Sequence, residues 1–114
     1  LDLVASRYGV QAQGATHVAL TVLDVLGYLD EIPVCVAYEL DGKRIDYFPP
    51  TAQLKHCKPI LQKLPGWKCD IRGIKKYEDL PENARNYVEF VEKEIGVPVW
   101  MVSNGPSRED IIYR

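Results

Sequence analysis

The sequence predicts an α/β fold with mainly parallel strands and an antiparallel hairpin. An amphipathic pattern over residues 81–95 leads through Gly96 into the apolar run Val97 to Val102, the order expected when a helix feeds a parallel strand. A second apolar run, residues 18–23, has the length of a buried strand. The dipeptide Asp41-Gly42 separates two β-rich runs, which is typical of a type I′ hairpin turn.

The first thirty residues are predicted to form a helix, a strand and a connection. Apolar residues in 1–13 recur at partly helical spacing, and Gly14 stands where such a helix would end. The buried strand 18–23 follows. Residues 25–29 are expected to form a turn or a short helical connection to the next strand.

The middle of the chain is predicted in part. Residues 33–40 and 43–48 are expected to pair as an antiparallel ribbon, and Pro49-Pro50 ends its second strand. Residues 54–64 stay undecided, because Pro59 would interrupt any helix that starts at Thr51.

The strongest helix prediction covers residues 81–95. Asp79 followed by Glu82 resembles a capping box, and Gly96 can adopt the left-handed conformation that ends a helix. One apolar face is expected to be buried, made of Ala84, Tyr87, Val88, Val91 and Ile95. Since no repeat or linker divides the chain, residues 1–114 are expected to form a single unit.

Two polar segments follow the predicted buried strands. Asp24 comes after the first, and the tetrapeptide Ser103 to Pro106 comes after the last. Ligands of open α/β sheets bind outside the carboxyl ends of the strands, so the two segments are candidates for one shared site. From the pattern alone, Asp24 as a cap of the following turn and Ser103 to Pro106 as an ordinary turn remain open alternatives.

Composition and charge exclude several classes of partner. The chain has 14 Lys and Arg against 16 Asp and Glu, so no strong field for nucleic acid or anionic lipid is expected. No apolar run approaches the roughly 20 residues that a membrane helix requires, and a cytosolic location is expected.

The three cysteines suggest reduced thiols rather than a disulfide framework, because their number is odd and no C-x-x-C pair occurs. A metal site built from His56, Cys57 and Cys69, with His17 or Cys35 as a fourth ligand, fits no usual zinc spacing. No metal ligand is therefore assigned.

Several ordered segments resemble one family of enzymes. The run T-V-L-D-V-L-G-Y-L-D-E-I-P-V-C-V-A-Y-E-L-D-G-K-R-I-D at residues 21–46 is similar to the carboxyl-terminal region of adenylosuccinate synthetases. The same order continues with L-P-G-W, Y-E-D-L-P-E-N-A-R-N-Y-V-E-F-V-E, G-V-P-V and S-N-G-P-S-R. The likeness covers essentially the whole chain.

The resemblance implies the carboxyl-terminal part of a P-loop-type nucleotide-binding fold. Members of the family are GTP-dependent ligases of purine synthesis that need Mg²⁺ and join inosine monophosphate (IMP) to L-aspartate, releasing GDP and phosphate. They phosphorylate the purine 6-oxygen, and the aspartate amine then displaces that phosphate. A homodimer is also implied.

The resemblance further implies that this chain supplies the guanine pocket. The guanine-binding Asp of the family falls on Asp24, whose carboxylate can accept hydrogen bonds from N1–H and the 2-amino group. The site residues implied are Val22, Leu23, Asp24, Ser103, Asn104, Gly105 and Pro106. Two positions depart from the family pattern, because Val22 replaces a common Lys and Gly27 a common Asp.

No glycine-rich phosphate loop of the form G-x-x-x-x-G-K-[ST] occurs in the chain. The likeness begins only in the last part of the longer family members, so we expect a carboxyl-terminal fragment that has no catalytic residues and is inactive alone. GTP or GDP would be the main ligand, and IMP, L-aspartate and Mg²⁺ would bind mainly elsewhere. The alternative is a stand-alone nucleotide-binding or dimerisation module without catalytic activity.

Overall fold

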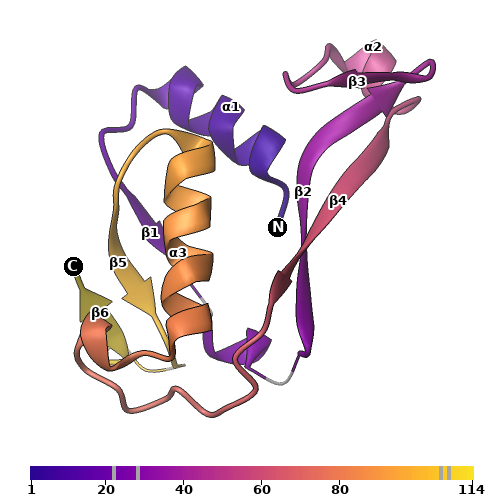
Figure 1. Cartoon of the computed structure of the whole chain (residues 1–114). Coiled ribbons are helices and arrows are strands. Elements are labelled where there is room, and N and C mark those ends of the chain that lie inside the picture. Colours follow the sequence, from indigo (N-terminus) through magenta and orange to yellow (C-terminus); the bar gives the residue numbers. More distant parts are fainter. Residues whose placement is uncertain (22, 28, 106, 108) are drawn as a thin grey trace.

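The computed structural model describes residues 1–21, 23–27, 29–105, 107 and 109–114, without the side chains of Asp24 and Val25. Figure 1 shows the arrangement of its elements. The helices are α1 (Leu3–Gln13), α2 (Thr51–Leu54) and α3 (Glu82–Ile95), with 3-10 turns η1 (Leu23–Leu26) and η2 (Tyr77–Asp79). The strands are β1 (Val18–Leu20), β2 (Glu31–Leu40), β3 (Lys43–Ile45), β4 (Lys58–Pro65), β5 (Val99–Ser103) and β6 (Ile111–Tyr113).

One sheet has the order β1-β5-β6 and forms the body of the molecule with α3 and α1. β1 pairs in parallel with β5, and β6 pairs antiparallel with β5. The predicted α/β class is confirmed, with the helix α3 leading into the parallel strand β5. The described strands pair mainly antiparallel, however, and not mainly parallel as expected, because β1 with β5 is the one parallel pairing among the strands described. The first predicted strand is shorter than expected, because β1 ends at Leu20 and Leu23 already belongs to η1.

The second sheet has the order β3-β2-β4 and is antiparallel throughout. In Figure 1 its long strands β2 and β4 extend away from the body, with α2 and β3 at the far end. The predicted hairpin is confirmed: Asp41 and Gly42 have φ of 52° and 79°, the two positive values that a type I′ turn requires. Its second strand is shorter than the expected 43–48, because β3 ends at Ile45, before Pro49-Pro50. The undecided stretch 54–64 proves to be mostly β4.

Helix α3 buries the five apolar residues predicted for its inner face. Gly96, with φ of 81°, ends the helix as expected. The predicted capping box is wrong. Pro81 occupies the N-cap position without a side-chain hydrogen bond, because Asp79 is already part of the separate turn η2.

Helix α1 is tied to α3 and to the second sheet. Asp2 caps it by accepting from the backbone N–H of Ala5 at 3.0 Å, and Gly14 ends it with φ of 64°. Arg7 donates to the backbone oxygen of Glu94 at 2.6 Å and to that of Asp46 at 3.2 Å, joining the end of α3 to the residues after β3. None of the helices in the described ranges is long and apolar enough to span a membrane.

Candidate functional site

The parallel pairing of β1 and β5 brings two polar segments to one edge of the body sheet. Leu20 is the register partner of Val102, so the chain leaves both strands at the same end. After β1 it continues into η1, which contacts β5, and after β5 it continues into residues 104 and 105. The two segments that the sequence placed in one candidate site therefore follow neighbouring strand ends (Figure 1).

Leu23 anchors the first segment, because its side chain is fully buried in the main core. Asp24 lies in the 3-10 turn that Leu23 begins, and its side chain is outside the described part of the structure. Val22 lies outside the described residues altogether. The structure thus describes the backbone that carries the candidate carboxylate.

The second segment is held by contacts within the protein. Ser103 is half-buried, and its Oγ donates to the backbone oxygen of Gly105 at 3.3 Å. The Asn104 side chain is fully buried and points inward, where its Nδ2 donates to the backbone oxygens of Ile71 at 2.8 Å and Ile74 at 2.9 Å. Pro106, the last residue of the predicted tetrapeptide, lies outside the described residues.

Gly105 is required by a close approach. A Cβ built on it would lie 2.4 Å from Oδ2 of Asp110, closer than non-bonded atoms come, so any larger residue would displace that carboxylate. Asp110 in turn organises the segment, because its Oδ2 accepts from the backbone N–H of Ser107 at 3.0 Å. Lys75 approaches from the connection before η2, with its Nζ 4.0 Å from Oδ1 of Asp110.

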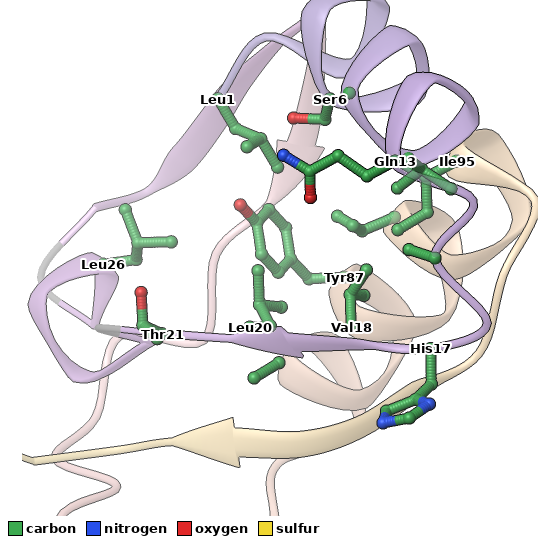
Figure 2. Close-up of a pocket in the computed structure, with 15 residues that line it drawn as sticks. Leu1, Ser6, Gln13, His17, Val18, Leu20, Thr21, Leu26, Tyr87 and Ile95 are labelled. Atoms are coloured by element: carbon green, nitrogen blue, oxygen red, sulfur yellow. The ribbon is translucent and has the colours of Figure 1, made fainter.

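A cavity of about 760 Å³ lies beside this edge, between α1, β1 and α3. Figure 2 shows Tyr87 and Gln13 pointing into it and the His17 ring pointing away. Thr21, which precedes the turn η1, and Leu26, its last residue, line one end. The sequence did not predict this cavity, because it is formed by side chains from three separate elements.

The cavity is chemically distinct from the strand-end edge. Burial raises the pKa of the Tyr87 phenol further above its usual value, so the group that points into the cavity is uncharged. Among the described residues, those lining the cavity include no Asp, Glu, Lys or Arg. Such a lining suits apolar groups better than a charged phosphate.

The described residues contain no cluster of three His, Cys, Asp or Glu that could hold a metal ion. The three cysteines are free. Cys35 of β2 is buried in a cluster with Val4 of α1, Cys57 is partly exposed and Cys69 is exposed.

Sequence reasoning missed the residues that hold the strand-end segment. Lys75 and Asp110 carried no motif of their own, although the spacing Ser107-x-x-Asp110 matches a local side-chain-to-backbone pattern that could have indicated the Asp110 contact. The inward direction of Asn104 had no signal, because an Asn in a turn is usually exposed.

Comparisons with a family model, a curated protein and a solved structure all match this chain to the same family. The family model described as adenylosuccinate synthetase matches residues 1–112. An adenylosuccinate synthetase of Streptococcus gordonii is 50% identical over 109 residues, covering 95% of this chain and 25% of that protein. The solved structure of a fully ligated adenylosuccinate synthetase from Plasmodium falciparum superposes with a TM-score of 0.94 at 30% identity, covering 100% of this chain and 28% of that one. The chain thus spans about a quarter of the length of these relatives.

Proposed function

Because the chain belongs to the adenylosuccinate synthetase family, we propose that it supplies the guanine-base pocket of a GTP-dependent ligase that joins IMP and L-aspartate. One observation carries this proposal: η1, with Asp24, and the segment Ser103 to Gly105 leave two parallel strands at the same edge. That is the position at which open α/β sheets bind ligands.

Guanine has the hydrogen-bonding edge that these residues would complement. The Asp24 carboxylate would accept from N1–H and from the 2-amino group, and charge-assisted bonds of this kind contribute about 1.5–3 kcal/mol each. In the segment Ser103, Asn104 and Gly105, the backbone N–H of Asn104 already donates to the backbone oxygen of Asp110, so that of Gly105 would address the 6-oxygen. Val22, Leu23 and Pro106 would complete the pocket. Adenine carries no donor at N1 and would leave the carboxylate unpaired, which penalises the wrong nucleotide as well.

The phosphate chemistry is assigned to the part of the relatives that this chain does not cover. Phosphoryl transfer depends on cations and donors around the phosphates, and Mg²⁺ would supply that charge there. IMP and L-aspartate would likewise bind mainly outside residues 1–114. The homodimer and the cytosolic location implied by the resemblance stay predictions.

The test uses the full-length enzyme that carries these residues, or a hybrid in which they replace the matching quarter of the Streptococcus gordonii relative. Asp24→Ala removes both proposed hydrogen bonds. It should raise KM for GTP and lower the preference for GTP over ATP by at least about 10- to 100-fold, the equivalent of one charge-assisted hydrogen bond. Steady-state kinetics with both nucleotides measure this ratio.

Asp24→Asn provides a gain of function that misfolding cannot imitate. The amide of Asn donates where the carboxylate accepted, so this variant should favour xanthosine triphosphate, whose 2-carbonyl accepts. The matched control is Asp79→Ala, which removes an exposed carboxylate in η2 and should leave selectivity unchanged. Unchanged nucleotide selectivity in both Asp24 variants would refute the proposed role.

A further inference from the structure

The segment after β5 is attached to a second loop through one buried side chain. We call residues 103–110 the rim loop, of which 106 and 108 are not described, and residues 66–76 the connection loop. Among the described residues, Asn104 of the rim loop is the polar residue that is completely buried. We propose that Asn104 is a positioning residue for nucleotide binding, which sets the place of the rim loop backbone through the connection loop. This inference rests on the proposed function.

The Asn104 amide is fully committed to this attachment. Its Nδ2 uses both hydrogens, on the backbone oxygens of Ile71 at 2.8 Å and Ile74 at 2.9 Å. The reversed orientation would set Oδ1 against two carbonyl oxygens, so the network determines which way the amide points. Its backbone N–H donates to the backbone oxygen of Asp110 at 2.9 Å, which closes the rim loop.

A second contact joins the same two loops. Lys75 donates from Nζ to the backbone oxygen of Glu109 at 2.9 Å, near the far end of the rim loop. The rim loop is thus tied to the connection loop through Asn104 near its start and Glu109 near its end. Because the Lys75 side chain is exposed and that of Asn104 is buried, Asn104 is the tether that water cannot replace.

The Asn104 side chain also carries a cost. Its Oδ1 is buried and has no hydrogen-bond partner among the described residues. A leucine would fill a similar volume without burying an unpaired oxygen, so the amide is unfavourable here except for its two donors. Those donors fix the start of the loop, directly beside the backbone groups proposed to face the base.

Two substitutions in the full-length enzyme test the inference. Asn104→Asp keeps the shape and removes both donors, and Asn104→Leu removes the donors together with the unpaired oxygen. Each should raise KM for GTP about tenfold, because the start of the rim loop loses its attachment to the connection loop, while KM for IMP and kcat at saturating GTP stay within about twofold. Asn104→Leu keeps the test usable if the buried charge of Asn104→Asp prevents folding.

The matched control is Asn83→Asp. Asn83 also donates from Nδ2 to the connection loop, at 2.9 Å to the backbone oxygen of Gly66, but it lies at the start of α3 and not in the rim loop. This variant should leave KM for GTP unchanged. A fall in kcat with unchanged KM for GTP in the Asn104 variants would overturn the inference, since it would indicate a merely structural role.

Asp24→Ala, measured alongside, separates the two proposals. If it alters GTP selectivity while the Asn104 variants keep the KM of the unsubstituted enzyme, the inference about Asn104 fails and the guanine pocket stands. If it has no effect on selectivity, the guanine pocket fails and the inference fails with it.

Discussion

The hydroxyl of Tyr38 donates to the carboxylate of Asp2, the residue that also caps α1. Tyr38 is buried, and burial together with the nearby Asp2 carboxylate raises the pKa of its phenol above the usual value. Burial and Asp2 raise the pKa of the neighbouring Cys35 thiol in the same way. The start of α1 is therefore held by a cluster that favours the protonated phenol and thiol.

This cluster predicts a loss of stability in alkali. An unfolded Tyr ionises near pH 10, whereas folded Tyr38 holds its proton to higher pH, so the contribution is complete below about pH 10 and falls as the pH rises further. Between pH 9 and pH 11 the melting temperature of Tyr38→Phe should fall less than that of the unsubstituted protein. Tyr47→Phe, at a side chain that is 57% exposed, should behave as the unsubstituted protein does. Equal falls for all three would contradict this reading.

At the candidate site, the sequence predicted which residues lie at the edge but not what each does. The order of strand and turn was enough to bring Asp24 and Ser103 to one end of the sheet. The direction of the Asn104 side chain depends on the carbonyls of Ile71 and Ile74, about thirty positions away. The need for glycine at 105 depends on Asp110 folding back against it. Neither contact is marked by a pattern in the neighbouring sequence, so neither could be predicted from it.

Among the elements, α3 and the last two strands are joined through Glu92. Its Oε2 accepts from the backbone N–H of Val99 at 2.7 Å and from Nη1 of Arg114 at 2.9 Å. The Arg114 guanidinium also lies 4.5 Å from the centre of the Tyr77 ring and donates to the backbone oxygen of Val99 at 3.1 Å. One carboxylate thus connects the helix to the strand that follows it and to the end of β6.

Removing Glu92 should loosen β5 and β6 more than removing its cationic partner does. Glu92→Ala leaves the part-buried N–H of Val99 without its acceptor, which costs about 1–3 kcal/mol. Arg114→Ala instead removes contacts with Glu92, the Val99 oxygen and the Tyr77 ring, and it leaves the N–H of Val99 paired. Hydrogen exchange at the amides of β5 and β6 should accelerate more in Glu92→Ala. Exchange that is equally fast in both variants would show that the Val99 contact adds nothing.

The elements that could be predicted are those whose pattern is local. The hairpin depended on Asp41-Gly42 and α3 on its own apolar face, and both are confirmed. β4 could not be predicted from its own sequence, because it is a strand by virtue of its pairing with β2, in which Pro59 lies opposite Tyr38. A proline is tolerated there because β4 is an edge strand of its sheet.

The molecule as a whole consists of a body and an extended antiparallel arm, with α1 packed against both (Figure 1). β1 is at the end of the order β1-β5-β6, beside the cavity lined by α1 and α3. The candidate site lies at the carboxyl ends of β1 and β5, whereas the turn between β2 and β3 lies at the far end of the arm. Guanine binding should therefore affect the body edge and leave the turn of the arm unchanged.

Hydrogen exchange of the full-length enzyme in the presence of GDP or ADP measures this difference. GDP should slow exchange at residues 21–27 and 103–107, ADP should not, and residues 39–45 of the arm should exchange equally fast in every case. Equal protection of the body edge by both nucleotides, or GDP protection that leaves residues 21–27 and 103–107 unchanged, would contradict a guanine pocket at the ends of β1 and β5.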